Sequence, residues 1–161
     1  MKKELKRTKK AIEELLKVLG DTEESLDDIN QAIVKTHEKV TKLEEEVMQL
    51  VTKMQRLERK IHKKLNKIAK VKRLILKADT DRKLKMYEKD YDRLVEELQT
   101  LEKKYKRFHE KYETLVLKEE KAVEKEMALE EEAARISEER YHAIAAVQES
   151  MGRLSGKLNR Y

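Results

Sequence analysis

Four histidines and thirty-three carboxylates are the residues of this sequence that could carry acid–base or metal chemistry. The histidines are His37, His62, His109 and His142, and none has a second histidine three or four residues away. His37 and Glu38 begin a zinc-binding helix motif, but Thr41 stands where that motif requires a second histidine. Glu44–Glu46 and Glu130–Glu132 are consecutive, so on a helix their carboxylates point in different directions and do not form a catalytic pair. With no cysteine and no glycine-rich phosphate loop, the sequence predicts no metal site, no cofactor, no small-molecule substrate and no enzymatic activity.

A second chemical signal is a concentration of positive charge in a chain whose net charge is +6. Between Lys53 and Lys77 there are eleven Lys or Arg residues and a single acid, Glu58. Six of these bases recur at spacings of three or four, which places them in one stripe of a helix: Lys53, Arg56, Lys60, Lys63, Lys67 and Lys70. The stripe is either a docking surface for an acidic protein, an anionic membrane or nucleic acid, or the solvated face of a charged helix. Two acidic segments, Asp21–Glu46 and Glu119–Glu139, each hold nine acids and three bases.

Long helices must position these side chains, because an apolar residue recurs on average every 3.5 residues from Leu26 to Ala78. Such a seam is buried along its whole length only when the helix winds around another helix. The pattern predicts a coiled coil, and the interface residues expected in this first arm are Leu26, Ile33, Val40, Leu43, Val47, Leu50, Met54, Leu57, Ile61 and Ile68. Two polar residues, Thr36 and Lys64, interrupt the seam.

The composition agrees with an extended helical protein. The chain has no proline, cysteine or tryptophan, and 45% of its residues are charged while 4% are aromatic, too few bulky side chains for a globular core. Sustained periodicity argues against disorder. The missing residue types also fit an idealised or engineered helical protein, but the irregular seam favours a natural origin. The sequence contains no signal-peptide core and no membrane span, so a soluble, cytoplasmic or otherwise intracellular protein is expected.

The apolar register of the first arm breaks at the middle of the chain. We expect a first helical arm at residues 1–78, a turn at 79–83 and a second arm at 84–161, because Asp and Thr residues in the turn are good helix N-caps. The prediction is a long antiparallel helical hairpin, and its alternative is one unbroken helix with a stammer near residue 80. Within the first arm, Gly20 and Asp21 offer a helix break, but the seam keeps its phase across them and favours a continuous helix.

The second arm carries a less regular seam. Its expected interface residues are Leu98, Leu101, Tyr105, Phe108 and Tyr112, and burial of these three aromatic rings is a better interpretation than a stacking platform for single-stranded nucleic acid. Glu119 and Glu126 fall on the seam. After Ile136 a four-residue step is expected to shift the phase, so that the stripe continues through Ile144, Val147, Met151, Leu154, Leu158 and Tyr161.

Apolar residues also lie off the seam, among them Leu16, Val34, Met48 and Leu65. They widen the stripe beyond what two helices bury, which predicts assembly into a multi-helix bundle. Heptads and length are shared with many unrelated hairpin stalks and cytoskeletal rods and name no family. The sequence thus favours a structural or scaffold protein whose partner is a protein, either a second copy or another coiled coil. The alternative is a binding module that holds an anionic partner on the basic stripe.

Overall fold

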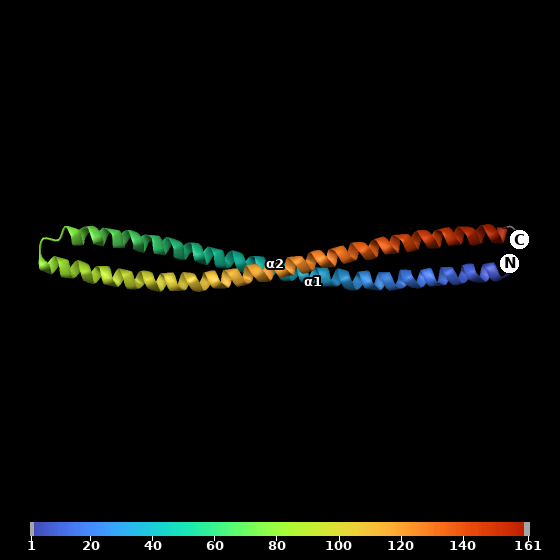
Figure 1. Cartoon of the computed structure of the whole chain (residues 1–161), viewed down its shortest axis with the longest axis horizontal. Helices are drawn as coiled ribbons and strands as arrows, with labels where there is room; N and C mark the ends of the chain where they lie inside the picture. The colour runs from blue at the N-terminus through green and yellow to red at the C-terminus, as the bar shows by residue number, and fades with distance from the viewer. Residues whose placement is uncertain (1, 160–161) are drawn as a thin grey trace. The chain divides into compact units, whose positions relative to one another are not determined.

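The chain folds into two long α-helices. The computed structural model describes residues 2–159, and the side chains of residues 2–156. α1 spans Lys2–Leu76, with 75 residues, and α2 spans Asp81–Asn159, with 79 residues. Neither proline nor a residue with positive φ interrupts the described backbone, and the charged residues between the apolar positions are good helix formers. The described residues thus form an all-α structure (Figure 1).

A four-residue connection, Lys77–Thr80, joins the helices. The Thr80 hydroxyl accepts a hydrogen bond from the Lys83 N–H at 3.2 Å, and the Thr80 carbonyl accepts one from the Leu84 N–H at 3.0 Å. Thr80 is therefore the N-cap of α2. Because this cap draws residues 81–83 into the first turn of α2, the connection ends earlier than the segment 79–83 expected from the sequence. It also begins two residues earlier, since α1 ends at Leu76.

α1 runs through Gly20 and Asp21 without interruption. A Cβ atom added at Gly20 would meet no heavy atom within 4 Å, so no close packing requires glycine at this position. The unchanged phase of the seam on both sides of Gly20 and the continuous backbone hydrogen bonds of α1 outweigh the low helix propensity of one glycine.

The two helices pack against each other in antiparallel directions, which confirms the helical hairpin and shows that the unbroken-helix alternative is wrong. The chain divides into two compact units. Unit 1 pairs the described residues up to Val40 with those from Lys121 onward, and unit 2 is the hairpin Thr41–Glu120 with its connection. Each unit contains a stretch of α1 beside a stretch of α2.

Polar contacts between the helices define one register in both units. They are His37–Glu126 and Arg140–Glu23 in unit 1, and Tyr105–Glu58 and Lys64–Glu97 in unit 2. The two residue numbers add up to 163 in the first three pairs and to 161 in the last. Residue n of α1 therefore lies opposite residue 162 − n of α2, a rule that sets Leu57 against Tyr105 in unit 2 and Thr36 against Glu126 in unit 1.

The burial of individual residues follows this register. In α1 the buried and half-buried positions recur at alternating steps of three and four along the whole described helix, including Thr22 and Thr36. The hydroxyls of these two threonines donate to the carbonyls of Val18 and Ala32 at 2.9 and 2.8 Å, so polar atoms in the seam remain hydrogen-bonded within their own helix. The packed layers are those expected of a two-stranded coil.

The phase shift expected in the second arm does not occur. Ala143 is 7% exposed, whereas Ile144 is 39% exposed, and Met151 is exposed while Ser150 is half-buried. From Leu84 to Leu154, the buried and half-buried positions of α2 alternate at steps of three and four. The reason is that α1 beside it keeps a strict heptad register. Burying small residues such as Ala143 and Ser150 costs less free energy than rotating the end of α2 out of that register. The side chains of Leu158 and Tyr161, which were expected on the shifted stripe, lie outside the described residues.

Candidate interaction surfaces

The a/d seam is occupied by the chain itself. All fifteen interface residues expected from the sequence are buried or half-buried in the structure, and they lie where α1 and α2 face each other. The most deeply buried of the fifteen are Val40 and Leu57, and Leu94, a seam residue of α2 outside this set, is buried to a similar degree. Since each helix covers the seam of the other, contacts with a further helix must use residues outside positions a and d.

Two sides of the hairpin remain for such contacts, and the heptad positions define them. One side carries positions e and b of each helix, and the other carries positions g and c. Grooves in the structure agree with this division, because the residues lining a groove at Lys60–Lys67 and Glu97–Leu101 all belong to positions g, c and d. Residues seven apart on one helix therefore share a side.

On the e/b side, polar contacts connect α2 to α1 in both units. The Tyr105 hydroxyl donates a hydrogen bond of 2.8 Å to Glu58, and this bond together with partial burial raises the pKa of the Tyr105 phenol. In unit 1, Glu126 lies in the seam with its side chain 17% exposed, and its Oε1 is 2.9 Å from Nδ1 of His37. These contacts attach seam residues of α2 to flanking residues of α1 and hold the helices in register.

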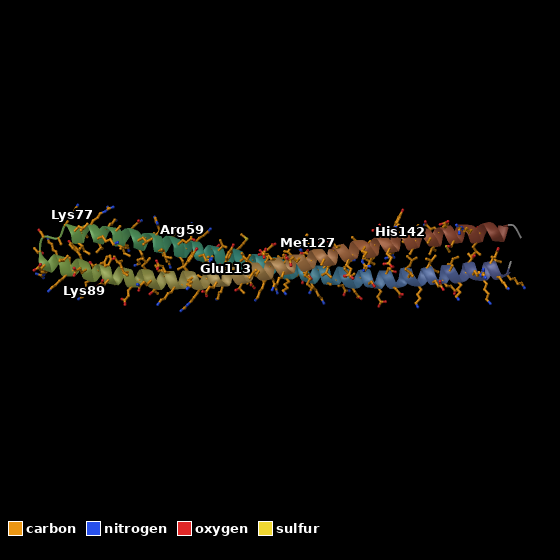
Figure 2. All side chains as sticks on the ribbon, in the orientation of Figure 1. Arg59, Lys77, Lys89, Glu113, Met127 and His142 are labelled. Atoms are coloured by element: carbon orange, nitrogen blue, oxygen red, sulfur yellow. The ribbon has the colours of Figure 1, made fainter. Side chains whose placement is uncertain are left out.

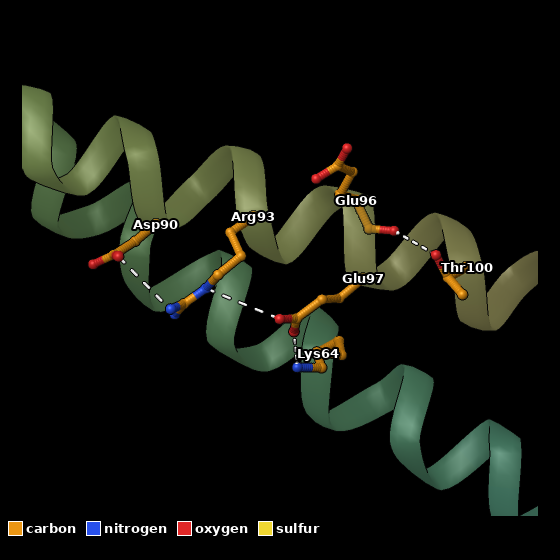
Figure 3. Close-up of polar contacts among 6 residues, drawn as sticks. All are labelled: Lys64, Asp90, Arg93, Glu96, Glu97 and Thr100. Carbon is orange, nitrogen blue, oxygen red and sulfur yellow. Dashed lines mark hydrogen bonds and ion pairs between the residues drawn. The ribbon is translucent and has the colours of Figure 1, made fainter.

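A charged cluster ties the helices on the g/c side of unit 2 (Figure 3). The half-buried ammonium group of Lys64 donates a hydrogen bond to Glu97, and Arg93 lies 3.9 Å from the same carboxylate. The hydrogen bond from Lys64 holds the pKa of the Glu97 carboxyl below its usual range, and the positive charges of Lys64, Arg93 and Lys67 act in the same direction, against the effect of partial burial. The carboxylate of Glu97 on α2 thus neutralises the positive charge that Lys64 brings into the seam.

The six bases of the predicted stripe are all exposed on the g/c side of unit 2. Lys60, Lys63 and Lys67 line a shallow groove of about 430 Å³ between the helices. α2 contributes further bases to the same side at heptad spacing from the groove residues Glu97 and Thr100; these are Lys104, Arg107, Lys111 and Lys118. We name the six stripe bases and these four α2 bases the basic side of unit 2. The α2 bases were not predicted from the sequence, although the seven-residue repeat of Lys104, Lys111 and Lys118 was a visible signal.

Part of the g/c side of unit 1, at residues 14–28 and 132–149, carries the opposite charge. A groove of about 550 Å³ lies there between the helices, and four carboxylates line it: Asp21, Asp28, Glu132 and Glu139. Glu14 and Glu149 occupy further c positions, one heptad before Asp21 and two heptads after Arg135, which is the basic residue in the groove lining. We name these six carboxylates the acidic side of unit 1.

The e/b side of unit 1 carries most of the exposed large apolar side chains of that unit. Of the eight large apolar side chains exposed in the described part of unit 1, seven occupy positions e or b, with exposed fractions from 37% to 69%. We name them the apolar face: Leu16, Val34, Val123, Met127, Tyr141, Ile144 and Met151. Both helices contribute to this face, and Met127 is seen projecting from α2 in Figure 2.

The histidines are distributed singly. His37 contacts Glu126, His109 lies 3.1 Å from Glu113, and His142 lies 3.8 Å from Glu138. Within residues 2–156, no three His, Asp or Glu side chains gather in a way that could hold a metal ion. Neither described helix contains an apolar stretch long enough to cross a bilayer.

No protein-family model, curated protein or solved structure matches this chain.

Proposed function

We propose that this chain is a non-enzymatic coiled-coil scaffold or spacer that self-associates through helix-on-helix contacts. The observation that carries the proposal is the apolar face of unit 1. The hairpin satisfies its own a/d seam, yet seven further large apolar side chains share one side of unit 1. Exposed large apolar side chains gathered on one side of a protein are typical of a protein interface.

The occupant that we propose for the apolar face is the same face of a second copy. Dimers with two-fold symmetry are the commonest homo-oligomers, and they bring one surface against itself. The apolar face spans both helices, so its width suits the four-helix packing that two hairpins would form. Polar residues bordering the face, such as Glu23 with Arg140, already have partners within the hairpin. Four-helix packing would remove the apolar side chains from water.

The test is the mass of the protein in solution, measured by sedimentation equilibrium at about 0.5 M salt, where exposed charges are screened. The wild-type chain is expected to form dimers or larger assemblies. A variant with Leu16→Gln, Tyr141→Gln and Ile144→Gln is expected to be monomeric with unchanged helicity, because it leaves the a/d seam intact. A monomeric wild-type chain over the accessible concentration range would refute the proposal.

A matched control replaces three exposed apolar residues of unit 2 that lie away from the apolar face. This variant carries Leu76→Gln, Met86→Gln and Leu117→Gln, and it removes the same number of large apolar side chains. It is expected to retain the mass of the wild type. Equal loss of assembly in both variants would show that general surface hydrophobicity, rather than this face, drives association.

A second candidate function is the docking of an anionic partner on unit 2. It is favoured by the composition of the basic side, where ten bases from two helices surround one acid, Glu97, at the g and c positions of residues 53–70 and 97–118. Reversal of Lys60, Lys63, Lys67 and Lys70 to Glu is expected to abolish binding to any such partner. Binding that survives this reversal would show that these bases only solvate the helix.

A further inference from the structure

The two charged sides of the hairpin use the same heptad positions and are opposite in sign. Both occupy positions g and c, and both flank a groove between α1 and α2. In unit 1, Asp21 and Asp28 line one wall while Glu132 and Glu139 line the other. In unit 2, bases from α1 and bases from α2 occupy the corresponding positions. Like charges therefore stand on both helices of each unit. At positions g and c, residues 14–28 and 132–149 hold six acids and one Lys or Arg, whereas residues 53–70 and 97–118 hold ten bases and one acid. The acidic excess is local to these segments, because the other g and c positions in the described part of unit 1 carry six bases and one acid.

The charges of the two sides also have the same repeat. Asp21 and Asp28 are seven residues apart, as are Glu132 and Glu139, and Lys60 and Lys67 have the same spacing. One heptad of helix advances about 10.5 Å, so opposite charges on two docked hairpins remain in step over several heptads. The register of contact is then fixed by charge, in the way that flanking charges select partners in coiled coils.

We propose that the basic side of unit 2 binds the acidic side of unit 1 in a second copy of this chain. The inference rests on the proposed self-association and names a second surface for it. The ligand chemistry is a double row of carboxylates held at heptad spacing on two helices. The contact lies on the opposite side of unit 1 from the apolar face, so the two interfaces respond to different variants.

The experiment uses the full chain with the apolar face disrupted, and its background carries Leu16→Gln, Tyr141→Gln and Ile144→Gln. At about 0.02 M salt this background is expected to associate, and the dissociation constant is expected to rise at least about tenfold at 0.5 M salt because the exposed charges are screened. A background that stays monomeric at low salt would overturn the inference. The proposed function would be judged separately, by the wild-type mass at high salt.

Charge reversal identifies the two surfaces. The first variant carries Arg56→Glu, Lys60→Glu and Lys63→Glu, and the second carries Asp21→Lys, Asp28→Lys and Glu139→Lys, each on that background. Each variant alone is expected to be monomeric at low salt, because its three reversed side chains then face charges of the same sign and three attractive contacts become repulsive. An equimolar mixture is expected to associate again, since each altered side of one variant meets a side of opposite charge on the other. A mixture that remains monomeric would overturn the proposal.

A matched control reverses three bases on the outer faces of unit 2. Arg59 and Lys89, labelled in Figure 2, and Lys103 are exposed at position f of their helices, and their change to Glu alters the net charge by the same amount. This control is expected to associate as the background does. If it does not, the loss of association in the charge-reversal variants is explained by the change in net charge rather than by the basic side.

Nucleic-acid binding is tested by a gel shift at physiological salt. If the background is monomeric and binds nucleic acid, and the variant with Arg56→Glu, Lys60→Glu and Lys63→Glu does not bind, the basic side recognises phosphate. That result would overturn the inference.

Discussion

Truncation of Leu57 to alanine tests whether the a/d seam stabilises the hairpin as its burial implies. Leu57 is 4% exposed and lies opposite Tyr105 in the register of unit 2. The change removes three carbon atoms, each worth about 0.8 kcal/mol when buried, or about 2.4 kcal/mol in total. Because grooves flank the seam, neighbouring side chains can relax, and the cavity contribution should be small. We expect a loss of about 2–3 kcal/mol, at the low end of the range for Leu→Ala changes in protein cores.

The assay is urea unfolding followed by circular dichroism at one protein concentration, with Leu76→Ala as the matched control. Leu76 is the same residue type on the same helix but is 86% exposed. By the same reasoning its truncation should cost about 0.3 kcal/mol. An unchanged slope of free energy against urea would show that the same surface unfolds in each variant. Equal costs for the two substitutions, or a cost below about 1 kcal/mol for Leu57→Ala, would refute the assignment of the seam as the principal source of stability.

Three further predictions concern single side chains. Gly20→Ala is expected to raise the free energy of unfolding by about 1 kcal/mol, because Gly20 is helical and a Cβ meets open space; a lower urea midpoint would contradict this. Glu126→Leu is expected to stabilise unit 1 by about 1 kcal/mol, because it places an apolar side chain in the seam. The control Glu124→Leu, on the exposed face, should change the free energy of unfolding by less than about 0.5 kcal/mol. Destabilisation by Glu126→Leu would show that the Glu126 carboxylate stabilises unit 1 more than a buried apolar side chain does. Glu97→Gln tests the pKa that the Lys64 hydrogen bond lowers. A carboxylate whose pKa is lower in the folded state stabilises the fold above its unfolded pKa and loses this contribution as the pH falls through the folded pKa. The difference in urea midpoint between wild type and Glu97→Gln should therefore be largest near pH 7 and shrink below about pH 4, and a difference independent of pH would refute the assignment.

Apolar periodicity was sufficient to predict the hairpin and its seam, because large apolar side chains such as Leu50 and Ile68 are favoured at buried positions and so mark the seam in the sequence. The end of the second arm was not predictable in the same way. Ala143 and Ser150 carry no strong apolar signal, whereas Ile144 and Met151 do, so the pattern favoured the wrong phase. The partner helix decides this phase, and its influence is absent from the sequence of α2 alone.

The charged sides show the same limit. The stripe from Lys53 to Lys70 was evident because its members are close together in the sequence. Its continuation on α2, beginning with Lys104, lies on the same side only through the register of the two helices. The acidic groove likewise combines Asp21 with Glu139, which the sequence separates by most of the chain. The charges themselves are visible in the sequence, and the antiparallel register determines how they are grouped.

The antiparallel register also governs the kinetics of folding. Contacts near the Thr80 cap join residues close in sequence, whereas the contact of Lys64 with Glu97 closes 33 residues and that of His37 with Glu126 closes 89. Each layer shortens the loop that the next one must close, so helix pairing is expected to nucleate beside the connection and to advance away from it like a zipper. Amide protons around Lys64 should therefore gain protection from hydrogen exchange earlier during refolding than those around His37.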